Sequence, residues 1–151
     1  MTAKTLQTKD GFDFSKKNKV SVWISECPYS DIPDEYFEET FSKQATRATN
    51  TWSENYRLRY FIPTAMETNG AHEGTIDLER AAGECSFSAS FITPLLSKAR
   101  KKKVTAVTWI ILLFECEYSS NLSGVEADQY TTFLGAFNYD DDAESLYDIE
   151  D

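Results

Sequence analysis

The chain has 151 residues, of which 25 are acidic and 15 are basic, and its net charge is −10. This length suits one domain that buries a sizeable core, and an apolar content of 41% is not that of a disordered chain. The negative charge argues against binding to nucleic acid or to an anionic membrane surface, because both would repel it, and it favours a basic partner.

The cysteines and the apolar stretches bear on the cellular compartment. Cys27, Cys85 and Cys116 are odd in number and far apart, so they do not predict a disulfide framework. The polar residues 1–10 lack the apolar core of a signal peptide, and the apolar stretch 107–114 is far below the roughly 20 residues of a membrane-spanning helix. We therefore expect a soluble protein with a cytoplasmic location.

The first strand follows a polar N-terminus. Residues 1–18 are expected to form a loose lead-in. In residues 19–25 the apolar side chains of Val20, Val22 and Ile24 occupy every second position. This period of two is typical of a strand that has one face in the core, so we expect the folded domain to begin with this strand.

The next stretch predicts a helix and a second strand. Residues 31–42 are predicted to be helical, with Asp31 as the cap and Pro33 in the first turn. Residues 44–55 are polar and ambiguous. Residues 56–62 alternate between apolar and polar side chains and predict a strand.

The middle of the chain predicts two helices. Residues 68–74 are expected to form a loop, and residues 75–82 a short helix. A longer helix is predicted over residues 88–102, because its apolar side chains recur at a spacing of about four. Pro94 is awkward inside that helix and predicts either a kink or a later start with Thr93 as the cap.

Two further strands precede an acidic tail. Residues 104–118 contain a run, residues 107–114, that is apolar on both faces, which is typical of a central strand covered on both sides. Residues 130–139 predict the final strand, in which Gly135 between two phenylalanines suggests a close approach. Residues 121–128 are expected to be a loop, and residues 140–151 hold seven acids and no base.

These elements predict an α+β fold, mainly an antiparallel sheet of about four or more strands with two or three helices packed on it. We expect a single domain over residues 19–139, preceded by the lead-in 1–18 and followed by the acidic tail 140–151. The tail is either a solubilising extension or a lure for a basic partner, since its acids are interleaved with aromatic and apolar side chains.

Catalytic and metal sites find little support. The three cysteines and His72 lack the paired spacing of a zinc site, and His72 is the single histidine that could activate a nucleophile. Glu115 and Glu117 form a carboxylate pair that could serve acid–base chemistry, but an exposed strand end explains them better. We expect no enzyme activity, no cofactor and no metal.

Four segments, in this order, resemble the immunity protein 22 family of bacterial toxin–immunity systems. They are Val20–Ile24, Cys85–Ile92, Ile111–Tyr118 and Phe133–Tyr139. The resemblance extends from residue 19 to residue 139, whereas residues 43–74 do not align and the acidic tail is an addition. It implies a non-enzymatic protein that binds and occludes a cognate toxin domain in bacterial competition, and such toxins are often basic nucleases.

We therefore expect a contact surface of acidic and aromatic residues at the first strand–helix turn and in the tail. The candidates are Glu26, Tyr29, Asp31, Asp34, Glu35, Glu38, Glu39, Tyr139, Asp140, Asp141, Asp142, Glu144, Tyr147 and Asp148. The alternative is a non-enzymatic scaffold module of the bacterial cytosol whose acidic tail only confers solubility.

Overall fold

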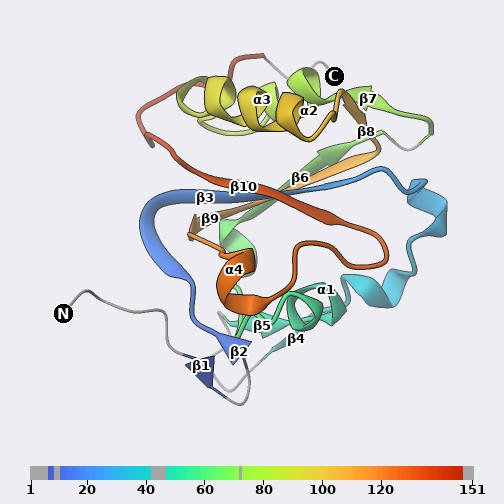
Figure 1. The fold of residues 1–151 in the computed structure, drawn as a ribbon, viewed down its shortest axis with the longest axis vertical. Helices are drawn as coiled ribbons and strands as arrows, with labels where there is room; N and C mark the ends of the chain where they lie inside the picture. Colours follow the sequence, from blue (N-terminus) through green and yellow to red (C-terminus); the bar gives the residue numbers. More distant parts are fainter. Residues whose placement is uncertain (1–6, 9–10, 42–46, 72, 148–151) are drawn as a thin grey trace.

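A four-stranded antiparallel sheet forms the middle of the molecule, in the strand order β10-β3-β9-β6 (Figure 1). The computed structural model describes residues 7–8, 11–41, 47–71 and 73–147. The four strands are β3 (Ser15–Ser25), β6 (Met66–Gly70), β9 (Trp109–Cys116) and β10 (Thr132–Asn138). The expected α+β fold with a mainly antiparallel sheet is confirmed.

Each face of the sheet carries a layer of other elements (Figure 1). One layer contains α2 (Leu78–Gly83) and α3 (Ile92–Lys101), and the other contains α1 (Thr51–Asn55) and α4 (Ser120–Ser123). Short strands pair in twos, and they are β1 (Gln7–Thr8), β2 (Gly11–Phe12), β4 (Thr40–Phe41), β5 (Ala48–Thr49), β7 (Ile76–Asp77) and β8 (Ala106–Val107). Four 3-10 turns complete the chain, and they are η1 (Tyr29–Asp31), η2 (Asp34–Tyr36), η3 (Pro63–Ala65) and η4 (Ser88–Ser90). No helix in the described part of the chain has the length and apolar character needed to cross a bilayer.

The sheet separates two hydrophobic cores, as the alternation in its strands requires. Val20 and Val22 point to the core beneath α2 and α3, whereas Trp23 points to the opposite core. The second core is aromatic, and the rings of Trp23 and Trp52 meet edge to face with centroids 4.9 Å apart. The central strand β9 is covered on both faces, as its apolar sequence predicts.

The predicted helix over residues 31–42 is wrong. The chain forms the two 3-10 turns η1 and η2, and Asp31 makes no capping hydrogen bond. Pro33 precedes η2 with extended backbone angles, so it separates two turns instead of opening a helix. Tyr36 is buried in the aromatic core, and this tertiary contact overrides the local helical pattern.

The predicted strand over residues 56–62 is also wrong. Arg57 adopts a left-handed backbone with φ 62°, which interrupts any extended run. Leu58 and Phe61 form only isolated bridges, and Phe61 is buried whereas its neighbour Ile62 is exposed. The expected loop over residues 68–74 instead contains most of strand β6.

Other boundaries moved by a few residues. The longer predicted helix begins only at Ile92, which agrees with the later start that Pro94 indicated. Its cap position is taken by Phe91 and not by Thr93. The expected loose lead-in is wrong for residues 11–18, because Phe12 and Phe14 are buried in the aromatic core and β3 begins at Ser15.

Candidate partner-binding surface

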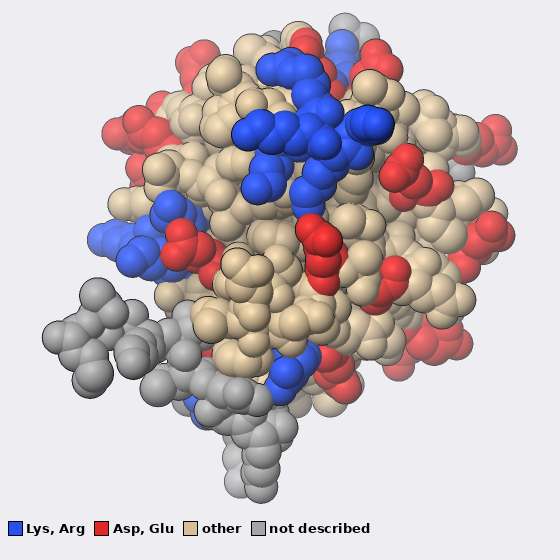
Figure 2. Space-filling view, in the orientation of Figure 1, with Lys and Arg blue, Asp and Glu red and all other residues tan. Residues whose placement is uncertain are grey.

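Residues 26–39, called the acidic segment below, carry six acids and no base. All six carboxylate side chains are exposed, and they belong to Glu26, Asp31, Asp34, Glu35, Glu38 and Glu39. Acidic side chains line the right-hand edge of the molecule in Figure 2, where Figure 1 places this part of the chain. With no cation inside the segment, its field is negative throughout.

The start of the acidic segment is fixed to the end of the central strands. The Thr108 hydroxyl donates a hydrogen bond of 2.6 Å to the carbonyl of Cys27, and the amide of Cys27 donates one of 3.1 Å to the Ser25 hydroxyl. Tyr29 then stacks on Trp109, with ring centroids 4.6 Å apart and planes only 14° from parallel. Trp109 therefore acts as a platform for the first turn of the segment.

Tyr36 anchors the second turn of the acidic segment. Its hydroxyl donates to the carboxylate of Asp128 and lies 2.9 Å from the Thr131 hydroxyl. Asp128 also accepts the backbone amides of Tyr130 and Thr131 at 2.9 and 2.8 Å, and the side-chain amide of Asn55 at 3.0 Å. The segment is thus tied to the loop before β10, and its acids are presented on an ordered backbone.

The tyrosines of this network stay protonated. Burial, the largest cause, raises the pKa of Tyr36, and the neighbouring carboxylate of Asp128 raises it further. Burial likewise raises the pKa of Tyr56, whose hydroxyl donates to the carbonyl of Thr131 at 2.8 Å. Both hydroxyls are therefore hydrogen-bond donors over the physiological pH range.

Two exposed aromatic side chains lie among or next to the acids. Tyr29 is 41% exposed and Phe41, just beyond the segment, is 52% exposed. Large apolar side chains beside charged ones are typical of interface anchors, because their burial on binding contributes more than rim charges do. The arrangement suits recognition of a basic protein surface.

The C-terminal segment, residues 139–147, turns its aromatic side chains inward. Tyr139 packs between Phe87 and Phe114, at centroid distances of 5.6 and 5.0 Å. Burial and the adjacent carboxylate of Glu115 raise the pKa of Tyr139 to about 12. This ring is therefore partly buried and packs against the core beneath α2 and α3.

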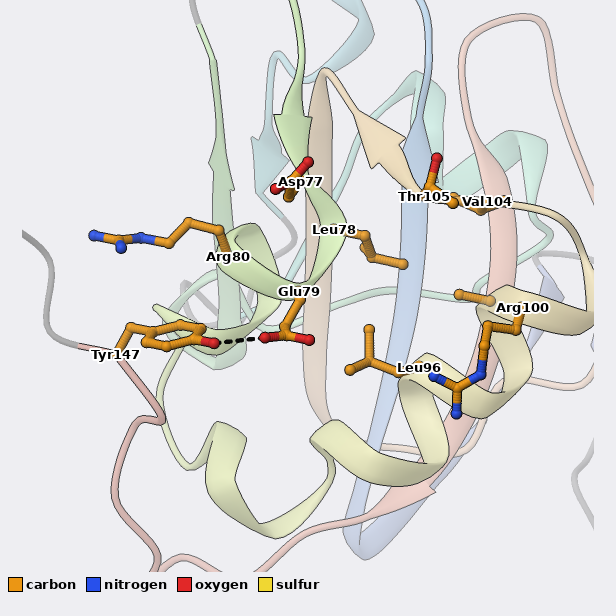
Figure 3. Close-up of a pocket in the computed structure, with 10 residues that line it drawn as sticks. Asp77, Leu78, Glu79, Arg80, Leu96, Arg100, Val104, Thr105 and Tyr147 are labelled. Carbon is orange, nitrogen blue, oxygen red and sulfur yellow. Dashed lines mark hydrogen bonds between the residues drawn. The ribbon is translucent and has the colours of Figure 1, made fainter.

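Tyr147, the last residue of this segment, packs onto α2. Its amide donates to the carbonyl of Gly83 at 2.9 Å and its hydroxyl donates to Glu79 at 2.6 Å, while Arg80 lies over its ring (Figure 3). The ring borders a groove of about 530 Å³ between α2 and α3. A Cβ atom on Gly83 would lie 2.5 Å from the Tyr147 ring, so glycine lets the segment approach the helix this closely.

The structure does not bring the two sets of predicted contact residues together. Tyr36 belongs to the aromatic core, whereas Tyr139 packs on the core at the opposite face of the sheet. Asp140, Asp141 and Asp142 are exposed and their carboxylates crowd within 4.8 Å of one another. Glu144 is also exposed, and Asp148 lies outside the described residues.

The cysteines do not converge on a metal-binding position. Cys85 and Cys116 are buried in different cores, on opposite faces of the sheet. Burial raises the pKa of Cys116 to about 12 and also raises that of Cys85, so both thiols stay protonated and are poor ligands or nucleophiles. His72 lies outside the described residues.

The carboxylate pair at the end of β9 makes structural contacts. Glu115 accepts the backbone amide of Asn18 at 2.6 Å, where both residues have left-handed backbones, and Glu117 pairs with Lys19 at 3.2 Å. The two side chains are exposed and serve different partners. They are not arranged as an acid–base pair.

A basic patch lies at the C-terminal end of α3. Lys98, Arg100, Lys101, Lys102 and Lys103 cluster at the end of α3, as the blue group in Figure 2 shows. Lys102 bridges to the Glu126 carboxylate at 3.0 Å and to the Phe133 carbonyl at 2.9 Å. These cations complement the negative end of the helix dipole.

Sequence reasoning found the acids of this surface but missed what holds them. The sequence pattern places Trp109 only in a buried strand and Asp128 only in a loop. The pairing of Asp128 with Tyr36 spans 92 residues, so no local pattern could reveal it. The one available signal was Asp128 itself, because an aspartate side chain that accepts backbone amides two residues further along the chain is typical of a turn.

Comparison with known proteins gives a family. A search of curated proteins and a search of solved structures returned no match. A protein-family model described as Immunity protein 22 matches residues 20–140, which include β6, β9, β10, the second half of β3 and the whole acidic segment. The chain therefore belongs to the Immunity protein 22 family, and its role is in immunity.

Proposed function

We propose that this protein binds and neutralises one cognate bacterial toxin whose surface is basic, as in a nuclease-type toxin, and that it does so in the cytoplasm. It occludes the toxin and transforms no substrate. A toxin that cleaves nucleic acid presents cations to its phosphates, and these cations are the complement of the acidic segment.

The observation that carries the proposal is the ordered acidic segment. Six exposed carboxylates lie within fourteen residues, without a cation, on a backbone that Tyr29 and Tyr36 anchor. A preformed surface binds without the entropic cost of ordering a loop. Opposite charges also raise the association rate above the roughly 10⁵–10⁶ M⁻¹s⁻¹ of neutral pairs.

The acidic segment is a better contact surface than the C-terminal segment. Its flanking side chains Tyr29 and Phe41 are exposed and can enter an interface. Tyr29 also stacks on Trp109 but remains 41% exposed, whereas Tyr139 and Tyr147 are only partly exposed and pack against the molecule. The exposed acids of the C-terminal segment then contribute only to the long-range field of a chain with net charge −10.

Co-expression tests this function. Cells would produce the C-terminal toxin domain encoded by the reading frame next to this protein, with the wild-type chain or with a frameshifted copy. The proposal predicts survival with the wild-type chain alone. Equal death in both cultures would refute it.

A further inference from the structure

The two edges of the central sheet differ in how well they are protected. At β10, the amide of Phe133 donates to the carbonyl of Glu126 at 2.7 Å, and the ammonium group of Lys102 donates to the carbonyl of Phe133. The register also shifts between Phe133 and Gly135. A bulge and a covering loop are devices that prevent a further strand from pairing.

In the part of the chain that the structure describes, the β6 edge has none of these devices. Its register with β9 runs without a shift from Met66 to Gly70, and the strand contains no proline, lysine or arginine. The side chains of Glu67 and Asn69 are held by the helical layer, where they bond to the amide of Ser86 and the carbonyl of Ala81, each at 3.0 Å. They therefore do not shield the edge.

The outward-facing backbone groups of β6 include those of Thr68 and Gly70. The amide of Ala71 donates to the carbonyl of Thr108 at 3.0 Å, and the alternation of an antiparallel ladder then turns the amides of residues 67 and 69 toward β9 as well. The amides and carbonyls of Thr68 and Gly70 point the other way. Both residues are exposed, and within the described residues these groups have no hydrogen-bond partner.

An aromatic hollow lies directly beside this edge. It has a volume of about 210 Å³ and is lined by Tyr29, Thr68, Asn69, Gly70, Ala71 and Trp109. The hollow therefore joins the edge of β6 to the first turn of the acidic segment. In a strand added to β6, every second side chain would face the side of the sheet on which this hollow lies, because side chains alternate between the faces of a sheet.

We propose that the cognate toxin docks by adding an extended segment to the β6 edge, with a basic side chain directed toward Tyr29 and the acidic segment. Backbone hydrogen bonds to Thr68 and Gly70 supply affinity, and the hollow together with the adjoining acidic segment supplies selectivity. A cation suits this place because aromatic faces and carboxylates both attract it. This inference rests on the proposed function and specifies how the toxin is bound.

Charge selects the toxin over a second copy of this chain as the occupant. Two copies paired through β6 would bring two acidic segments together, each with six carboxylates and no base. Like charges facing across an interface are destabilising. A basic segment is attracted by the same groups.

A proline placed on each edge provides the test. Thr68→Pro removes an outward-facing backbone amide and blocks pairing at β6. Ala136→Pro is the matched change on β10, because the backbone amide of Ala136 also faces away from the neighbouring strand β3. Binding of the purified neighbouring toxin domain is measured by calorimetry. We expect Thr68→Pro to raise the Kd at least about 10-fold and Ala136→Pro to change it less than about 2-fold.

Amide hydrogen exchange of the wild-type chain provides a readout that needs no variant. We expect the amides of Thr68 and Gly70 to exchange rapidly in the free protein and to be protected in the toxin complex. If the wild-type chain binds the toxin but these amides stay unprotected, the docking edge is refuted and the immunity function stands. If the wild-type chain does not bind the toxin, both proposals fail. Protection in the free protein together with a dimeric mass would show a second copy at the edge and overturn the inference.

Discussion

The acidic segment and the C-terminal segment have similar compositions and opposite arrangements. Both mix exposed carboxylates with tyrosines, but Tyr29 of the former remains 41% exposed, whereas Tyr139 and Tyr147 of the latter pack onto the molecule. The difference arises from their neighbours, because Tyr29 stacks on the single ring of Trp109, whereas Tyr139 packs between the two rings of Phe87 and Phe114. Charge alone therefore does not identify a contact surface, and the availability of the aromatic side chains does.

The largest expected effect comes from removing one exposed side chain from each region. Tyr29 and Leu146 are 41% and 42% exposed, so Tyr29→Ala and Leu146→Ala are matched in exposure. We expect Tyr29→Ala to weaken toxin binding by about 2 kcal/mol, or about 30-fold in Kd, as truncation of an interface anchor does. We expect Leu146→Ala to leave the Kd unchanged. Calorimetry measures both, and a larger loss for Leu146→Ala would reverse the assignment of the two regions.

The next effect concerns the tyrosine that holds each region in place. Tyr36→Phe removes a hydroxyl that is hydrogen-bonded to Asp128 and Thr131 in a buried position. We expect it to lower the free energy of unfolding by about 1–2 kcal/mol, because it removes a hydrogen bond to a carboxylate and one to a buried hydroxyl. Tyr147→Phe removes a bond to Glu79 at the surface, and we expect no measurable change. Urea unfolding measures both, and equal losses would show that the acidic segment is no better anchored than the C-terminal one.

The smallest expected effect is on how the stability difference between wild type and Tyr36→Phe depends on pH. Because burial raises the folded-state pKa of Tyr36, the unfolded chain loses this proton first, and the stabilisation present below the unfolded pKa decreases as the pH rises above it. With an unfolded pKa of about 10, the tyrosine loses about 0.4 kcal/mol of its contribution at pH 10. We expect the difference in stability between wild type and Tyr36→Phe to narrow by this amount between pH 8 and pH 10 in urea titrations. A constant difference would mean that the hydroxyl has an ordinary pKa in the folded protein.

The central strands could be predicted because burial leaves a local pattern. β3 alternates with a period of two and β9 is apolar on both faces, so each sequence reports its place in the sheet. Strand β6 has the sequence METNG, with no such alternation, because an edge strand faces little of the core. Its position depends on pairing with β9, which the local sequence does not encode.

The candidate surface could be predicted in composition and not in arrangement. The six acids of the acidic segment are among the contact residues that the sequence predicts, and all six are exposed. The helix expected there is wrong because Tyr36 finds its partners at Asp128 and Thr131, more than ninety residues away. The separation of the two acidic regions onto opposite faces likewise follows from tertiary packing.

The most direct test compares two charge reversals of equal size. One variant carries Asp34→Lys, Glu35→Lys and Glu38→Lys, and the other carries Asp140→Lys, Asp141→Lys and Asp142→Lys, so each changes the net charge from −10 to −4. All six side chains are exposed, and stopped-flow measurement of toxin association at low salt gives the rate for each variant.

If the acidic segment is the contact surface, its variant associates about 10-fold more slowly than the C-terminal variant, because attraction acts most strongly between charges that meet at the interface. Equal rates for the two variants, or a slower rate for the C-terminal variant, would contradict the assignment of toxin binding to the acidic segment.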